Sequence, residues 1–163
     1  MNMHHPIKIY NGKIILRDKI IPQGTVLVSD GVIKGIEEGD IEMAGAQEIN
    51  ANGQYISPGF IDIHVHGGCG FDFMDGTTEA FLKIAEIHAQ YGTTAMLPTT
   101  LTSEKEDLIQ TLKAYDLAND MNRMGASFIS MHLEGPSFAM NQRVAQVPTS
   151  IRDPAPASSH DTL

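Results

Sequence analysis

The sequence predicts an α/β fold in which a small antiparallel β module precedes parallel strands that alternate with helices. Two observations lead to this prediction. Short β-branched runs separated by turn dipeptides fill residues 7–57, a pattern typical of antiparallel hairpins. After residue 57 the pattern changes to strand, helix, strand, helix and strand. Helices placed between apolar strands favour parallel pairing through right-handed crossovers.

Within the predicted β module, strands are separated by dipeptides that favour tight hairpin turns with positive φ. These dipeptides are Asn11-Gly12, Asp30-Gly31 and Asn52-Gly53. The predicted strands cover residues 7–10, 13–16, 25–29, 32–37, 48–50 and 55–56. The acidic residues between positions 37 and 42 are expected to lie in a solvated loop. The pattern therefore predicts an antiparallel module over residues 1–57.

The run PGFIDIHVHGG at residues 58–68 predicts a strand with two histidines on one face. Because side chains alternate along a strand, His64 and His66 face the same way as Asp62, and Val65 faces the opposite way. A lone His-x-His pair also occurs by chance. However, polar groups on an apolar strand are costly to bury without partners, and a divalent cation supplies such a partner. The run therefore predicts a metal site at the end of this strand.

Two helices and two further strands are expected after the histidine strand. They cover residues 77–91 (helix), 93–97 (strand), 103 to about 125 (helix) and 127–133 (strand). Thr77 can cap the first helix, and Ser103 with Glu106 has the spacing of a capping box for the second. The histidine pair and Glu134 each lie at a predicted strand end. Parallel α/β folds gather their chemistry at such carboxyl ends, so these side chains are expected to meet.

Composition narrows the class of protein. The 163 residues are 42% hydrophobic and 19% charged, which indicates a globular protein with a core. The net charge of −9 would repel nucleic acids and anionic membranes, so neither is an expected partner. The N-terminus shows neither a signal peptide nor a membrane span. Cys69 is a single cysteine, and with these observations it indicates a cytoplasmic location.

Three further side chains near the histidine strand receive structural interpretations. His132 shares a strand face with Glu134, and packing or orientation of the site is favoured over metal ligation. His88 lies on an apolar helix face, which indicates a buried histidine with satisfied hydrogen bonds. Cys69 has no basic neighbour to lower the pKa of its thiol, so it is interpreted as a small neutral filler.

The histidine run, together with MHLEGPSF at residues 131–138, resembles the N-acetylglucosamine-6-phosphate deacetylase family of the amidohydrolase superfamily. The resemblance extends to YGTTAMLPTT at residues 91–100 and to the small β module. It implies an incomplete TIM-like (β/α)8 barrel, with about the first three βα units over residues 58–147. A small antiparallel β-sandwich module over residues 1–57 would precede it, and residues 148–163 would form a disordered tail.

The resemblance also implies a metal-dependent amide hydrolase that removes acetate from N-acetylglucosamine 6-phosphate in amino-sugar catabolism. His64, His66 and Glu134 would bind one or two divalent ions, either zinc or iron or another transition metal. Gln146, where relatives often have a histidine that touches the sugar, would bind substrate together with Gly67 and Gly68. The family's catalytic aspartate would lie beyond residue 163, and the full-length enzyme would be a homodimer.

Two alternative functions stay open. A dihydroorotase-like hydrolase of cyclic amides commonly bridges two metals with a modified lysine, but the sequence has no lysine after Lys113 and offers Glu134 instead. The other alternative is a non-catalytic fragment. A complete barrel takes roughly 250 residues, and fewer than half that number follow residue 57. We therefore expect a truncated or frame-shifted chain that is marginally stable and has no deacetylase activity by itself.

Overall fold

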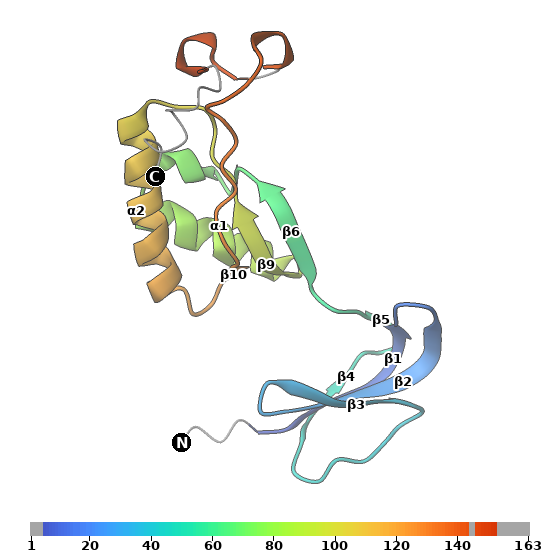
Figure 1. The fold of residues 1–163 in the computed structure, drawn as a ribbon. Helices are drawn as coiled ribbons and strands as arrows, with labels where there is room; N and C mark the ends of the chain where they lie inside the picture. The colour runs from blue at the N-terminus through green and yellow to red at the C-terminus, as the bar shows by residue number, and fades with distance from the viewer. Residues whose placement is uncertain (1–4, 144–145, 153–163) are drawn as a thin grey trace. The chain divides into compact units, whose positions relative to one another are not determined.

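The computed structural model describes residues 5–143 and 146–152. The chain divides into two compact units, Met1–Pro58 and Gly59–Leu163, which we call the β module and the α/β unit (Figure 1). The β module contains β1 (Ile7–Ile15), β2 (Ile20–Ser29), β3 (Val32–Glu38), β4 (Gln47–Asn50) and β5 (Tyr55–Ile56). The α/β unit contains β6 (Phe60–Val65), β7 (Gly67–Gly68), β8 (Phe71–Asp72), α1 (Thr78–Gln90), β9 (Thr93–Pro98), α2 (Lys105–Met121) and β10 (Ser127–Phe128).

The described part of the β module is one mixed sheet, which differs from the predicted antiparallel β-sandwich. The strand order is β3-β2-β1-β4, and β5 also pairs with β1. The pairs β1–β2 and β2–β3 are antiparallel, whereas β4 and β5 both run parallel to β1. The physical reason lies at Asn52-Gly53, where the backbone N–H of Gly53 donates to the Asn11 carbonyl at 2.7 Å. This turn carries the chain onward along β1 instead of folding β5 back onto β4.

The other two turn dipeptides behave differently from each other. Asp30 and Gly31 have φ values of 54° and 73° and form the predicted hairpin between β2 and β3. Asn11-Gly12 instead lies inside β1, where the pairing register with β2 shifts, so it forms a bulge in one long strand. The chain turns between β1 and β2 only later, where the Leu16 N–H donates to the Lys19 carbonyl at 2.9 Å.

A buried lysine holds the loop that follows β3 to the β module. The Nζ of Lys8 lies 2.8 Å from Asp40 Oδ1, 3.1 Å from Glu48 Oε1 and 3.6 Å from Glu42 Oε1. The hydrogen bond with Asp40 raises the pKa of Lys8 above its ordinary value, although burial acts in the opposite direction. Two residues of the acidic segment predicted to be a solvated loop therefore pair with the lysine.

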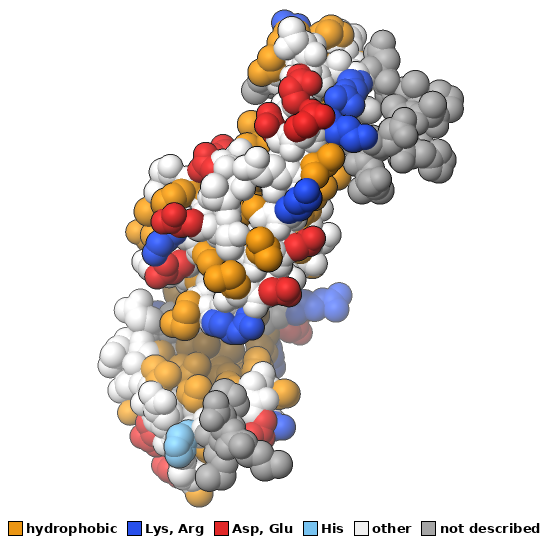
Figure 2. Space-filling view, turned by 90° about the vertical axis from the view of Figure 1, so that its left-hand side faces the viewer, with side chains coloured by type: hydrophobic (Ala, Val, Ile, Leu, Met, Phe, Trp, Pro, Cys, Tyr) orange, Lys and Arg blue, Asp and Glu red, His pale blue; other side chains and the backbone are white. Residues whose placement is uncertain are grey.

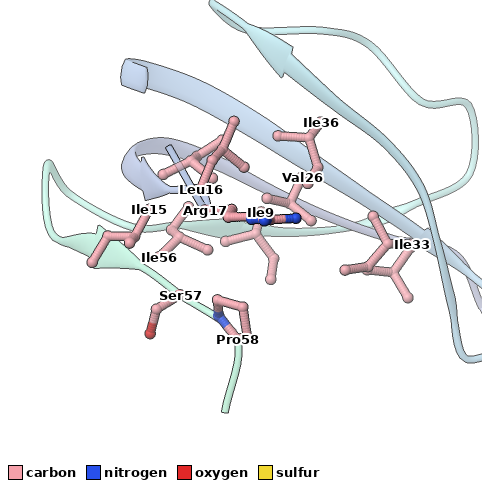
Figure 3. Close-up of a pocket in the computed structure, with 12 residues that line it drawn as sticks. Ile9, Ile15, Leu16, Arg17, Val26, Ile33, Ile36, Ile56, Ser57 and Pro58 are labelled. Atoms are coloured by element: carbon pink, nitrogen blue, oxygen red, sulfur yellow. The ribbon is translucent and has the colours of Figure 1, made fainter. Parts of the chain in front are cut away.

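The β module also has an apolar hollow with a volume of about 540 Å³, shown in close-up in Figure 3. Its lining residues are mostly isoleucine and valine: Ile9, Ile14, Ile15, Leu16, Arg17, Val26, Val28, Ile33, Ile36, Ile56, Ser57 and Pro58. Several of these side chains are exposed among the described residues, including Ile33 at 58%. The hydrophobic side chains gathered in the lower part of Figure 2 lie in this region.

The α/β unit contains a parallel sheet in the order β10-β9-β6, with both helices packed against it (Figure 1). The core joins residues of the two helices and all three strands: Val65, Phe73, Phe81, Ile84, Ala85, Met96, Ala114, Ala118, Ala126 and Phe128. Phe81 is fully buried, and its ring centroid lies 4.7 Å from that of Phe73 and 5.9 Å from that of Phe128. A helix follows each of β6 and β9, as the sequence predicts.

Helix ends and strand lengths show where local pattern succeeds and fails. Thr77 Oγ1 accepts a hydrogen bond from the Ala80 N–H at 3.2 Å, which confirms the predicted cap of α1. The predicted capping box of α2 is wrong, because Ser103 Oγ donates to the Glu104 carbonyl and Glu104 itself occupies the cap position. The predicted strand over 127–133 is regular only at Ser127–Phe128 and then continues through single backbone hydrogen bonds to β9.

The predicted disordered tail begins with described structure. Pro148–Ser150 forms a 3₁₀ turn, and the Arg152 N–H donates to the Pro136 carbonyl at 2.9 Å. These backbone contacts tie residues 148–152 to the segment that follows Glu134. Residues 153–163, the rest of the predicted tail, lie outside the described residues. Over the described ranges, no helix combines the length and apolar character needed to cross a membrane.

Candidate metal centre

Two histidines converge at the end of β6. Val65 lies in the core shared with the helices, so its neighbours His64 and His66 take the opposite face of the strand. Their Nε2 atoms are 3.3 Å apart, and the two rings meet edge to face. The alternation predicted from the sequence therefore brings both imidazoles to one point.

Glu134 completes this group from the segment that follows β10. Its Oε2 lies 3.3 Å from His64 Nε2 and 3.2 Å from His66 Nε2. A backbone pairing between Thr99 and His132 sets the approach of this segment to the end of β9. The Glu134 N–H then donates to Thr100 Oγ1 at 3.2 Å. The three side chains predicted as metal ligands are thus together, and they form a group that could hold a metal ion.

The spacing and chemistry of these atoms fit a divalent cation. Bonds of about 2.0–2.1 Å in a tetrahedral zinc site place neighbouring ligand atoms about 3.3 Å apart, which matches the spacing of this triangle. Glu134 Oε2 is buried and receives no hydrogen bond from the described residues. A buried carboxylate oxygen without a donor is costly, and a cation bound between the three atoms would remove that cost.

Hydrogen bonds hold the ring of His66 and the main chain of His64 at the site. His66 Nδ1 lies 3.2 Å from the Thr99 carbonyl, which can only accept a hydrogen bond, so Nδ1 carries the proton. The lone pair of His66 is then on Nε2 and directed at the other ligands. The backbone N–H of His64 donates to Asp62 Oδ1 at 3.1 Å, so the side chain two residues earlier in β6 holds the main chain of His64.

His132 lies beside the ligand triangle rather than within it. Its ring meets that of His64 edge to face at a centroid distance of 4.9 Å. Its Nδ1 lies 3.4 Å from the Ile63 carbonyl. The geometry is that of packing against a ligand, in keeping with the interpretation drawn from the sequence.

The glycines after His66 make close contacts with the protein itself. A Cβ on Gly67 would collide with the carbonyl of Phe71 on β8, and one on Gly68 would lie 3.1 Å from His88 Nε2. His88 in turn contacts the Gly67 carbonyl through Nε2 at 3.2 Å, so it is hydrogen-bonded as expected, although it is only partly buried. Cys69 is exposed, with a φ of 55°. Packing within this turn is sufficient to explain why both positions are glycine.

Gln146, predicted as a substrate ligand, is only 6% exposed. Its Nε2 donates to Glu134 Oε1 at 2.7 Å, and its Oε1 accepts from the Thr102 N–H at 2.9 Å. Sequence reasoning missed this contact with Glu134 because nothing local in the sequence links positions 134 and 146.

The site is open to solvent on the histidine side. The side chains of His64 and His66 are 48% and 35% exposed, and that of Glu134 is 26% exposed. Structural zinc sites are closed by four protein ligands, whereas catalytic sites keep a position for water or substrate. Three ligands with one accessible side therefore match a catalytic site better than a structural one.

Comparison with curated proteins gives consistent relatives. The chain is 32% identical over 143 residues to the N-acetylglucosamine-6-phosphate deacetylase of Bacillus subtilis, covering 85% of this chain and 36% of the relative. It is 31% identical over 126 residues to an N-acetylgalactosamine-6-phosphate deacetylase of Escherichia coli O157:H7, covering 77% of this chain and 32% of the relative. This chain is a homologue of the N-terminal part of N-acetylglucosamine-6-phosphate deacetylases. No protein-family model matches it.

Solved structures of these deacetylases share its fold. The Pasteurella multocida deacetylase superposes with a TM-score of 0.84 at 22% identity, covering 96% of this chain and 41% of that one. The Thermotoga maritima deacetylase gives a TM-score of 0.72 at 25% identity, covering 95% and 39%. A Mycobacterium smegmatis variant, solved in complex with N-acetyl-D-glucosamine-6-phosphate, gives 0.79 at 22% identity, covering 98% and 40%. The chain spans about two fifths of each of these deacetylases.

A dihydroorotase is a more distant neighbour. Its TM-score is 0.50 at 20% identity, covering 79% of this chain. Its lower TM-score makes it a distant structural neighbour, so the dihydroorotase-like alternative is not favoured.

Proposed function

We propose that this chain is the metal-binding N-terminal part of a hydrolase that removes acetate from N-acetylglucosamine 6-phosphate. The observation that carries the proposal is the triangle of His64, His66 and Glu134, whose ligand atoms lie 3.2–3.3 Å apart. The deacetylases among its homologues support this substrate class. The relative named for N-acetylgalactosamine 6-phosphate makes that epimer the second substrate to test.

The proposed site would hold one or two divalent ions, the first between the three side chains. Its nitrogen and oxygen ligands suit zinc, and iron or another transition metal could use the same set. Such a cation, when bound, polarises an amide carbonyl and activates water for attack. The Thr99 carbonyl keeps the lone pair of His66 on Nε2, and Thr100 holds the backbone of Glu134 in place.

We further propose that residues 58–147 are the first part of a (β/α)8 barrel. The parallel order β10-β9-β6, with a helix after each of β6 and β9, supports this arrangement. The metal triangle lies where β6 ends and where the segment after β10 passes the end of β9, which is the active-site face of such barrels. A cytoplasmic enzyme that forms a homodimer at full length would fit the composition and the family resemblance.

For the 163-residue chain alone, we propose metal binding without turnover. The three candidate ligands are partly exposed to solvent. The chain spans about two fifths of the deacetylase structures that it matches. A non-catalytic metal-binding fragment is thus the second candidate function, favoured by this partial coverage. Turnover of N-acetylglucosamine 6-phosphate by the purified chain, above that of Glu134→Ala, would contradict the absence of activity and support the substrate.

Metal binding is tested by titrating the metal-free chain with Zn²⁺ in competition with a chromophoric chelator. We expect one saturable zinc site of modest affinity in the wild type, because only three protein ligands are present, and a loss of at least about tenfold in affinity for His66→Ala and for Glu134→Ala. His5→Ala is the matched control, because His5 is exposed and lies in the β module. Absence of zinc binding by the wild type, or equal affinity in all four proteins, would refute the site.

A further inference from the structure

We propose that Gln146 is a positioning residue that holds Glu134 in the orientation needed for metal binding. The inference rests on the proposed metal site and identifies the group that controls one of its ligands. It also assigns Gln146 a role other than the sugar contact predicted from the sequence.

The first argument is that both ends of the Gln146 amide are already used inside the protein. The residue is buried, with only 6% of its surface exposed. Its Oε1 accepts from the Thr102 N–H at 2.9 Å, which can only donate, so the NH₂ group must point the other way. That NH₂ group meets Glu134 Oε1 at 2.7 Å. No polar atom of the side chain is left facing a sugar except the second amide proton.

The second argument is that this contact divides the two carboxylate oxygens between separate tasks. Glu134 Oε1 accepts a hydrogen bond from the Gln146 amide. Its Oε2 accepts no hydrogen bond from the described residues and faces the two imidazole nitrogens. A carboxylate held at one oxygen cannot rotate freely about its terminal bond. Gln146 therefore favours a single ligating oxygen and lowers the entropy cost of binding a cation.

The backbone of Thr102 anchors the arrangement. Thr102 lies in the loop after β9. The first residue of that loop, Thr99, orients His66 through its carbonyl. The loop after β9 thus helps to position two candidate ligands from different segments, His66 directly and Glu134 through Gln146. Outer hydrogen-bond partners of this kind typically account for about 10–100-fold in metal affinity.

The test compares zinc affinity in the wild type, Gln146→Met and Gln142→Met, with circular dichroism recorded on each metal-free protein. Methionine keeps the length of the side chain but cannot donate to Glu134. Gln142 is exposed and provides the matched control. We expect about 10–100-fold weaker zinc binding for Gln146→Met and no change for Gln142→Met.

A double-mutant cycle separates positioning from a general effect on folding. In the Glu134→Ala background, adding Gln146→Met should cause no further loss of zinc affinity, because the group that it positions is gone. An equal loss in both backgrounds, or wild-type affinity in Gln146→Met, would overturn the positioning role while leaving the metal site intact. Absence of zinc binding by the wild type would instead refute the proposed metal site itself.

Discussion

The two units of this chain bury their apolar residues in different ways. The α/β unit packs Phe81 of α1 among aromatic rings from other elements, and the residue is fully buried. In the β module the charged side chain of Lys8 is buried as well as apolar Ile14, whereas Ile33 on β3 is 58% exposed beside an apolar hollow. The comparison teaches that packing should dominate the stability of the α/β unit. Paired charges should matter more in the β module.

The largest expected effect is that of Phe81→Ala. Removing a fully buried ring that contacts Phe73, Tyr115 and Phe128 leaves a cavity, and the free energy of unfolding of the α/β unit should fall by about 3–5 kcal/mol. Urea unfolding followed by far-ultraviolet circular dichroism measures it through α1 and α2. Tyr91→Ala, at a position that is 79% exposed, serves as the control. A loss below about 1 kcal/mol would contradict a core centred on Phe81.

Gly67→Ala should have the next largest effect. The added Cβ would collide with the Phe71 carbonyl, so β7 and β8 must separate, at a cost of about 1–3 kcal/mol. Because Gly67 follows His66, zinc affinity should fall as well. The same urea experiment and the zinc titration measure both changes. Gly35→Ala is the comparison in the other unit, because an added Cβ there would make only ordinary contacts, the nearest at 3.7 Å from the Leu27 side chain. Unchanged zinc affinity would show that the turn moves independently of the ligand.

Lys8→Met sharpens the comparison from the side of the β module. Removing the ammonium group leaves Asp40, Glu42 and Glu48 without their shared partner, so the unfolding midpoint of the β module should fall. This decrease should be smaller than the decrease that Gly67→Ala causes in the α/β unit. Methyl resonances assigned to isoleucines of β1, such as Ile14, report on the β module, and Lys34→Met on exposed β3 is the control. Equal unfolding midpoints for the two lysine variants would show that the ion pairs of Lys8 do not stabilise the β module.

The contribution of Lys8 to the stability of the β module should depend on pH in a defined direction. Hydrogen bonding to Asp40 raises the pKa of Lys8 in the folded state, so the folded state holds the proton more tightly than the unfolded chain does. The contribution is complete below the unfolded lysine pKa of about 10.4 and is lost as pH rises through the higher folded value. The difference between wild type and Lys8→Met should therefore be constant from about pH 7 to 10 and shrink above that range.

The smallest effect is expected for Ile33→Thr. The side chain is exposed at the edge strand β3, so the free energy of unfolding should change by no more than about 0.5 kcal/mol. Binding of a hydrophobic fluorescent dye should nevertheless decrease, because Ile33 lines the hollow. A loss of more than 1 kcal/mol would mean that this residue is packed like those of the α/β unit.

Local sequence pattern predicted the order of strands and helices in the α/β unit and the convergence of the three candidate ligands. The alternation in β6 places His64 and His66 on one face, and the position of Glu134 at a strand end brings it to them. The Thr77 cap and the Asp30-Gly31 hairpin follow from backbone preferences of neighbouring residues. Each of these features depends on residues within a few positions of one another, or on the common edge of a parallel sheet.

Other features were decided by contacts between distant positions. Only the fold brings Lys8 to Asp40 and Glu48, or Gln146 to Glu134 and Thr102. The dipeptide Asn11-Gly12 could form a hairpin by its own preferences, but pairing of β1 with β2 and β5 makes it a bulge within one strand. The sequence by itself thus determined which residues could bind a metal. The tertiary structure decided which partners orient them, because a hydrogen bond across many residues depends on chain packing and leaves no periodic signal in the sequence.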